Sequence, residues 1–528
     1  MSSKLLAEIA TRARSPVLIE HAGAPLVANF VRDHLRVDPG SRCVVVATAS
    51  ARRRAAIVPH FLRRGGFHAL QLELPDSAPT EAAVSAAVDA ARRTGATFIV
   101  AYGGSAAASI GRAAAALAAN GGRLADYAPE LGGRTTLQLP SMPFLAVPSC
   151  PAGGAELDRE AVLLAGNGGG RGGGGGVLAT LRSHRASHQA ALVDPALAVS
   201  LAPEAVRATG FATLVHCAEA FLRLDSDAPS RTLALEGVRR AVWALPASLS
   251  HPTDARPRAE LALASLIAGA LRAGGERLGA ARGLALAVSA RYRVSYADAL
   301  TAVAPEALSA SLDVALERYE EDPDDIEEDD KDGAEREFVD AIEGLAPRSA
   351  AMRARLAKAR REDAAADAEV GADSEMRALL APYAAAADAA LRGGGRISGG
   401  DGAAQERALR SSDMGLRMDL SPPCVDDDAV ETIVRFARLS GLLRRVTTGV
   451  GGDDGHVGRD LEDFGLRLRD LRSCGEAAGV PRAPSLQSLG LAAADYAAVA
   501  AAANVDANVV ANCVSLRVAD LNAILERS

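Results

Sequence analysis

The stretch Thr97-Phe-Ile-Val-Ala-Tyr-Gly-Gly-Ser105 decides the fold of this chain, together with the alanine-rich segment Ala106–Ala119 that follows it. Thr97–Tyr102 is a short apolar run with β-branched members, which is typical of a buried parallel strand. Gly103-Gly104-Ser105 predicts a tight turn and Ala106–Ala119 a helix. Backbone N–H groups at the start of such a helix form a phosphate site, because glycine leaves room for the ligand. A plain turn that needs glycine only for its geometry is the alternative interpretation.

The same alternation of strand and helix continues on both sides of this stretch. The expected strands are 16–20, 42–48, 68–74, 97–102 and 144–147, and the expected helices between them are 51–64, 80–94 and 106–119; residues 190–195 (AALVDP) close this half of the chain. This order predicts a parallel sheet with helices on both faces, and therefore a Rossmann-like α/β domain over residues 1–195.

From residue 196 onward the pattern becomes helical, which predicts an all-α domain over residues 196–528. Apolar residues recur at helical spacing in 204–222, 231–249, 255–271, 279–292, 430–445, 495–503 and 518–527. A polar and acidic insertion is expected at about 318–421. We expect this insertion to offer a contact surface for a protein partner.

Charge and cysteine content limit the classes of function. The net charge is −8, and Glu320–Asp332 alone holds ten acidic residues and one lysine, so the rest of the chain is close to neutral. We therefore expect no nucleic-acid surface. Six scattered cysteines without a C-x-x-C pair indicate reduced thiols in an intracellular protein. The cytoplasm is the expected compartment, and the mitochondrion is the alternative. The apolar runs contain charges, so no membrane span is expected.

The order of motifs resembles the iron-containing alcohol dehydrogenase superfamily, which includes glycerol dehydrogenases and maleylacetate reductases. The stretches that carry this resemblance are Leu74–Thr80 (LPDSAPT), Tyr102–Ser105 (YGGS), Pro143–Glu156 (PFLAVPSCPAGGAE), Leu192–Pro203 and Thr209–Glu219 (TGFATLVHCAE). The likeness covers roughly residues 15–305 and 470–528. It implies an N-terminal domain that binds NAD or NADP, a helical domain, a metal between them and a homo-oligomer.

The resemblance also implies which residues contact the dinucleotide. They are Thr48, Gly103, Gly104, Ser105, Ser149, Gly153 and Gly154. Tyr102 stands where the family has the first glycine of its cofactor loop, so weak binding is expected. Arg112 follows the position of a family lysine by one residue.

The expected metal position departs from the family pattern. In the family, the ligands are an Asp, a His four residues later and two further His. Here these positions read Ala212, His216, Arg282 and Tyr296, and no histidine occurs between His251 and His456. A single imidazole cannot hold a catalytic divalent ion, which needs about three protein ligands. We therefore expect no bound metal.

Two classes of function follow from these departures. The first is a structural or regulatory subunit with impaired catalysis, in which His216 is packed between helices. The alternative is a metal-independent NAD(P)-dependent reductase of a small carbonyl substrate, similar to maleylacetate reductase. In that case His216, Arg282 and Tyr296 are the candidate catalytic residues, with Arg282 stabilising an alkoxide and Tyr296 donating a proton.

Overall fold

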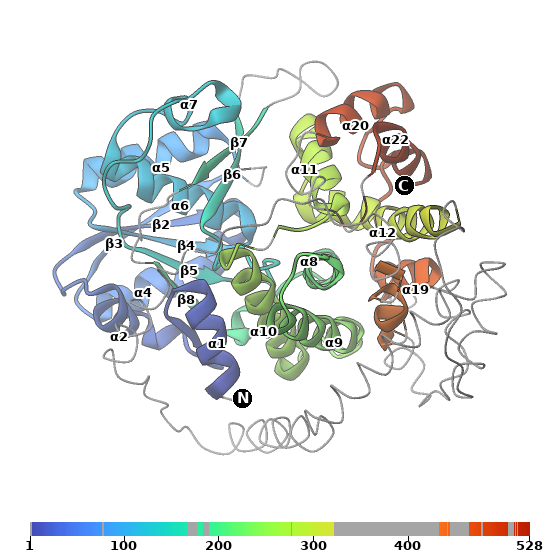
Figure 1. The fold of residues 1–528 in the computed structure, drawn as a ribbon. Helices are drawn as coiled ribbons and strands as arrows, with labels where there is room; N and C mark the ends of the chain where they lie inside the picture. Colours follow the sequence, from blue (N-terminus) through green and yellow to red (C-terminus); the bar gives the residue numbers. More distant parts are fainter. Residues whose placement is uncertain are drawn as a thin grey trace.

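The computed structural model shows two parts side by side, a sheet flanked by helices and a group of helices (Figure 1). The structure describes residues 3–75, 79–165, 177–182, 189–275, 277–320, 432–433, 435–440, 442–443, 464–476, 479–504, 512, 514 and 516–528. The 166–176 glycine run, the acidic run after residue 320 and nearly all of the 318–421 insertion lie outside these residues. The 430–445 helix is described only in part.

The first part is built on a six-stranded sheet in which every strand pair is parallel. Its order is β1-β8-β5-β4-β2-β3. The strands are β1 (Val17–Ile19), β2 (Arg42–Thr48), β3 (His68–Leu74), β4 (Phe98–Gly103), β5 (Phe144–Pro148) and β8 (Gln189–Val193). The central strands are apolar along nearly their whole length because both of their faces are covered.

Helices cover both faces of this sheet, as the sequence predicts. Successive side chains of a strand point to opposite faces, so Ile99 of β4 packs with one helix layer and Val100 with the other. The first layer consists of α5 (Glu81–Thr94) and α6 (Ser105–Asn120). The second layer consists of α2 (Val27–Phe30), the π-helical turn η2 (Val31–Leu35) and α4 (Ile57–Arg64).

The chain leaves strands β2 and β4 in opposite directions. From β2 it runs outward to the edge strand β3, whereas from β4 it runs the other way, to β5. In open α/β sheets, ligands bind in the crevice outside the carboxyl ends of the two strands at such a reversal. The carboxyl ends here are Thr48 and Gly103, so this crevice is the expected ligand site.

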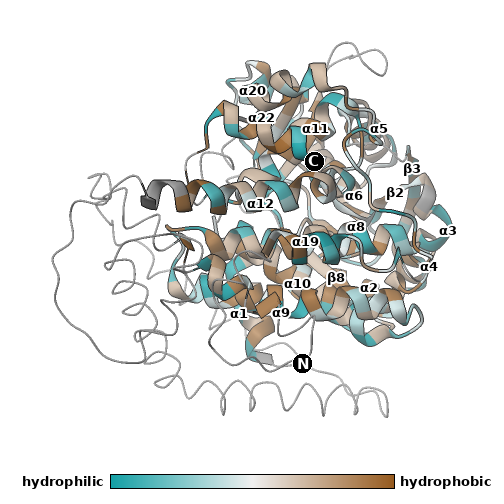
Figure 2. Cartoon of the chain, turned by 90° about the vertical axis from the view of Figure 1, so that its right-hand side faces the viewer, coloured by the Kyte–Doolittle hydropathy of each residue, from teal (hydrophilic) through white to brown (hydrophobic). Residues whose placement is uncertain are grey.

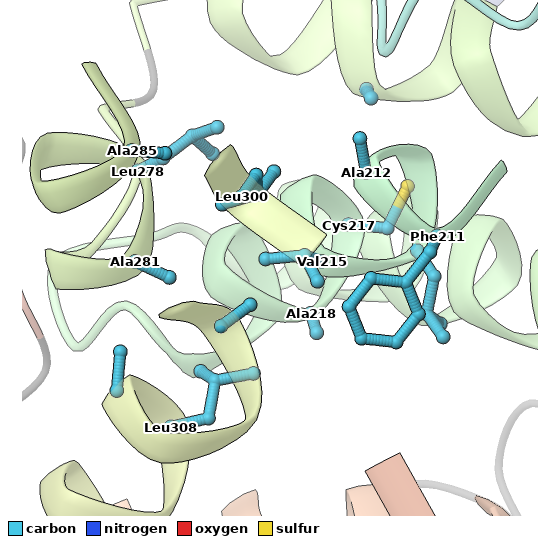
Figure 3. Close-up of a cluster of buried hydrophobic side chains, with 14 of the residues drawn as sticks. Phe211, Ala212, Val215, Cys217, Ala218, Leu278, Ala281, Ala285, Leu300 and Leu308 are labelled. Atoms are coloured by element: carbon cyan, nitrogen blue, oxygen red, sulfur yellow. The ribbon is translucent and has the colours of Figure 1, made fainter. Parts of the chain in front are cut away.

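The second part is helical. Its elements are α8 (Pro203–Leu222), α9 (Ala228–Ser250), α10 (Ala255–Ala273), α11 (Ala280–Tyr292), α12 (Tyr296–Glu320), α19 (Phe464–Arg472), α20 (Tyr496–Asn504) and α22 (Val518–Arg527). Figure 3 shows Ala212 and Val215 of α8 in an apolar cluster with Leu300 of α12 and Ala281 of α11. This core is made largely of alanine and leucine.

The sequence did not predict several of the described elements, among them a strand pair and a long helix. β6 (Glu160–Ala165) and β7 (Val177–Arg182) form an antiparallel pair. The glycine run between them in the sequence predicted only a loop. Helix α12 spans 25 residues after Arg293, and Figure 2 shows it between α19 and the pair α20 and α22. Pro305 lies inside α12 and interrupts the helical pattern of the sequence, so this helix was not predicted.

Helix α12 bears on the expectation that the chain has no membrane span. Among the described helices, Tyr296–Leu316 is long and apolar enough to cross a membrane by length and composition alone. Most of this segment is buried inside the protein, where it packs against other helices.

Candidate functional site

The glycine turn after β4 has the geometry of a phosphate site. Gly103 has φ +147°, a value that favours glycine, and Gly104 is the N-cap residue of α6 without a side-chain cap. A Cβ at Gly104 would lie 3.1 Å from Cys150 Sγ. The 16-residue helix therefore directs uncapped N–H groups into a cradle that a side chain would fill. These residues fit the pyrophosphate of a dinucleotide.

The structure brings together five of the seven predicted cofactor residues. Thr48 ends β2, Gly103 and Gly104 follow in the turn after β4, and Ser105 begins α6. Ser149 follows β5, and its N–H donates to the carbonyl of Gly103 over 3.1 Å. The order β5-β4-β2 places all five at one edge of the sheet.

Gly153 and Gly154 serve the contact between the two parts of the molecule. Both have positive φ, +59° and +89°. A Cβ at Gly153 would lie 2.8 Å from His216 Nδ1, and one at Gly154 would lie 2.2 Å from the backbone nitrogen of Gly269 on α10. The Gly154 N–H donates to Ser265 Oγ over 2.9 Å. This packing explains both glycines, and their contact with a cofactor stays a prediction.

The three predicted catalytic residues meet at the expected metal position. His216 of α8 is buried, and its Nε2 lies 2.7 Å from the hydroxyl oxygen of Tyr296. Arg282 Nη1 donates to the same hydroxyl oxygen over 3.4 Å, and its guanidinium lies over the Tyr296 ring. His216 Nδ1 lies 2.8 Å from the carbonyl oxygen of Gly153. If Nδ1 donates to this carbonyl, Nε2 accepts the Tyr296 proton.

Two members of this cluster, Arg272 and Asp158, were not predicted from the sequence. Arg272 is in the last turn of α10, and its Nη1 donates to the Gly153 carbonyl over 2.6 Å and lies 2.9 Å from His216 Nδ1. Its Nε and Nη2 donate to the two Asp158 carboxylate oxygens over 3.0 and 2.8 Å. Arg272 is the one basic residue in the last turn of the apolar helix α10, and this position could have marked it. The sequence did not show which carboxylate it pairs with.

Glu219, one helical turn after His216, holds the start of α11. Its Oε1 accepts the N–H groups of Ala281, over 2.8 Å, and of Arg282, over 3.4 Å. Asn512 Oδ1 accepts the N–H of Ala280 beside it. Burial raises the pKa of Glu219 to about 7, and these backbone donors oppose the rise. This carboxylate therefore positions the backbone of Arg282.

The ionisation states of the cluster follow from burial and from its two arginines. Burial, with the charges of Arg272 and Arg282, holds the pKa of His216 well below its ordinary value. Burial raises the pKa of Tyr296 to about 12. Burial alone would raise the pKa of Asp158, but Arg272 and Arg282 together hold it below the ordinary value. At neutral pH the site therefore holds neutral His216 and Tyr296, two cations and one carboxylate.

This donor set does not fit a divalent cation. Ala212, at the position of the family's Asp, is buried in the apolar cluster of Figure 3. Both nitrogens of His216 already have polar partners, and the positive guanidinium groups of Arg272 and Arg282 lie beside His216 and Tyr296, where they would repel a cation. Within the described part of the chain, no three His, Cys, Asp or Glu side chains are arranged to hold a metal.

Arg112 lies away from the glycine turn. Its Nη2 donates to the carbonyl of Ala155 over 2.9 Å, and its guanidinium stacks over the Phe144 ring. Burial lowers its pKa to about 10. Arg112 therefore holds the loop that carries Gly153 and Gly154.

Comparison with known proteins agrees with this architecture. Residues 28–194 match the family "iron-containing alcohol dehydrogenase", and residues 206–387 match the C-terminal domain of the same family. The chain belongs to the iron-containing alcohol dehydrogenase superfamily. The 4-hydroxybutyrate dehydrogenase of Cupriavidus necator is 30% identical over 164 residues, which cover 31% of this chain and 41% of that protein. The match thus spans less than half of that relative's length.

Solved structures of the superfamily share the fold over nearly the whole chain. A 1,3-propanediol oxidoreductase superposes with a TM-score of 0.64 at 16% identity, over 97% of both chains. Maleylacetate reductase from Agrobacterium tumefaciens superposes with a TM-score of 0.53 at 16% identity, over 97% of this chain and 95% of that one. These likenesses confirm the expected α/β domain followed by a helical domain.

Proposed function

We propose that this member of the iron-containing alcohol dehydrogenase superfamily has lost its metal site, retains weak dinucleotide binding and acts as a structural or regulatory subunit. The observation that carries the proposal is the cluster at the metal position. Two arginines, a neutral histidine and a tyrosine bond to one another where the family's mechanism requires a Lewis acid.

The cluster also joins the two parts of the molecule, which supports a structural role. Arg272 of α10 forms a two-bond ion pair with Asp158 of the sheet domain. Nearby, Ser265 of α10 donates to buried Glu156 over 2.7 Å. Protein atoms thus link the two parts at the place where a metal would otherwise do so.

The turn after β4 supports retained dinucleotide binding. Its uncapped helix start and glycines need only backbone atoms to bind a pyrophosphate. We also propose that the protein is a homo-oligomer, which light scattering tests. We propose further that a protein partner contacts the 318–421 insertion, which deletion of the insertion tests.

A metal-independent reductase is the second candidate, and the shared hydroxyl of Tyr296 favours it. A reduced dinucleotide, when bound, supplies hydride. If His216 Nδ1 accepts from Arg272, its Nε2 donates to the Tyr296 oxygen, and the Tyr296 proton is then free for a substrate oxygen. Arg282 would stabilise the charge on that oxygen. Half-buried Tyr296 and Arg282 retain some exposure to a ligand.

Elemental analysis and turnover on one purified sample decide between these functions. We expect less than a tenth of an equivalent of iron or zinc, and no oxidation of NADH or NADPH with small aldehydes, ketones or maleylacetate, with or without chelator. Near one metal per chain, lost in His216→Ala, would refute the lost metal site.

Chelator-resistant turnover would instead establish the reductase. In that case Tyr296→Phe and Arg282→Ala should each lower kcat about 100-fold, the usual cost of removing one preorganised donor. Arg291→Ala is the matched control, because Arg291 pairs with Asp495 outside the cluster.

A further inference from the structure

Three consecutive arginines follow β2 at the ligand crevice. Arg52, Arg53 and Arg54 open the short helix α3 (Arg52–Ala55). No acidic residue occurs between Thr48 and Arg64. This side of the crevice is therefore strongly cationic.

The arginines lie across the crevice from the glycine turn. They follow the carboxyl end of β2, and β2 pairs with β4 up to Ala47 and Tyr102. The positive charge of Arg54 reaches buried Tyr102 and partly buried Cys150, where it opposes the rise in pKa that desolvation causes in both. Arg54 is thus near enough to this turn to act electrostatically on two of its side chains.

The three arginines differ in the hydrogen bonds and ion pairs that they form within the protein. Arg52 pairs with Glu73 of β3 over 3.2 Å, but both side chains are exposed, so this ion pair is weak. Arg54 donates to the carbonyl of Ser200 over 3.5 Å. Arg53 is exposed and has no hydrogen bond or ion pair with any residue that the structure describes.

We infer that this crevice selects NADP(H) over NAD(H), with Arg53 and Arg54 binding the 2′-phosphate of the adenosine ribose. The inference rests on the dinucleotide binding proposed above and adds the class of dinucleotide. In nucleotide-binding sheets, a carboxylate in this region accepts the ribose 2′-hydroxyl of NAD, whereas arginine accommodates the 2′-phosphate of NADP. Guanidinium groups match phosphate with paired, charge-assisted hydrogen bonds.

Binding measured without turnover tests the inference. Isothermal titration of the full chain with NADPH and NADH should show NADPH bound at least tenfold more tightly. Adenosine 2′,5′-bisphosphate should likewise bind more tightly than 5′-AMP, which lacks only the 2′-phosphate. Arg53→Ala should weaken NADPH binding about 10- to 100-fold, as expected for a lost hydrogen bond to a charged group, and leave NADH unchanged.

Arg64→Ala provides the matched control. Arg64 is an exposed arginine at the far end of α4, next to the amino end of β3, so it should alter neither affinity. Circular dichroism of each variant verifies folding. Equal affinities for NADPH and NADH, or an equal loss in Arg53→Ala and Arg64→Ala, would overturn the NADP assignment but leave dinucleotide binding intact. Binding of neither nucleotide would overturn both.

Discussion

The crevice after β2 and β4 and the cluster around His216 have diverged to different extents. The crevice has an uncapped helix start, a positive-φ glycine and three arginines on one side. The cluster has alanine, arginine and tyrosine at three of the four positions that carry ligands in the family. The two sites lie in one molecule and meet at the loop that carries Gly153.

The difference reflects which atoms each site needs. Backbone N–H groups bind a pyrophosphate, so such a site tolerates many side-chain changes as long as its glycines remain. A metal needs several specific side chains in one geometry, and losing two of them removes the site. Buried polar atoms need partners, and here Arg272 bonds to the Gly153 carbonyl and lies beside His216, while Arg282 donates to Tyr296.

The largest effect is expected where the two parts touch. Gly154→Ala should destabilise the protein by about 4 kcal/mol or prevent folding, because a Cβ there would lie 2.2 Å from the backbone of Gly269 at φ +89°. Gly132→Ala is the matched control: its φ is +81°, but nothing lies within 4 Å. It should cost only the strain of left-handed backbone, about 1 kcal/mol. Urea unfolding measures both, and equal losses would contradict a tight contact at Gly154.

A smaller effect is expected from breaking the ion pair of the cluster. Arg272→Ala should lower the free energy of unfolding by about 3 kcal/mol, because it leaves the largely buried Asp158 carboxylate without its charge partner. Arg239→Ala removes a more exposed arginine from its pair with Glu236 and should cost less than about 1 kcal/mol. If both variants unfold at the same urea concentration, the cluster does not hold the domains together.

Glu219 should give stability a distinctive pH dependence. Its pKa is raised from 4.5 to about 7 in the folded state, so between these values the folded protein binds a proton that the unfolded chain has released. The contribution of Glu219 to the free energy of unfolding is therefore largest below pH 4.5. It falls as the pH rises to about 7 and is constant above that pH. Glu219→Gln should remove on the order of 3 kcal/mol of this change, at 1.36 kcal/mol for each pKa unit.

The measurement compares the two proteins at several pH values. His216 acts in the opposite direction, because its lowered pKa makes the folded state lose stability as the pH falls below about 6.5. The difference between wild type and Glu219→Gln cancels this contribution. A difference that stays constant from pH 5 to pH 8 would show that Glu219 is ionised throughout.

The sequence was sufficient for the elements that have a periodic pattern. Strands β2 and β3 and helix α22 have the expected bounds, because apolar periodicity and glycine turns mark them. The meeting of His216, Arg282 and Tyr296 followed from the resemblance. The partnership of Arg272 with Asp158 could not be predicted, since it depends on how two domains pack and no local pattern records that.

The smallest effect on stability is expected at Gly104, in the turn after β4, where a substitution should affect mainly dinucleotide binding. Gly104 has an ordinary φ of −93°, so alanine is not strained there, and its Cβ would lie 3.1 Å from Cys150 Sγ. We expect Gly104→Ala to change stability by less than about 1 kcal/mol, but to weaken NADPH binding at least tenfold, because the methyl group fills the cradle at the start of α6. Titration with NADPH, with urea unfolding alongside, measures both.

The double variant Gly104→Ala with Cys150→Ala separates two causes of that loss. It removes the sulfur atom that the new methyl group would press against, so any distortion of the turn should be relieved. Binding that stays weak in the double variant shows that the methyl group occupies the space of the phosphate. Recovery of binding would show that the loss came from a displaced turn. Full binding in Gly104→Ala alone would place the dinucleotide elsewhere and would contradict the proposal that the crevice binds it.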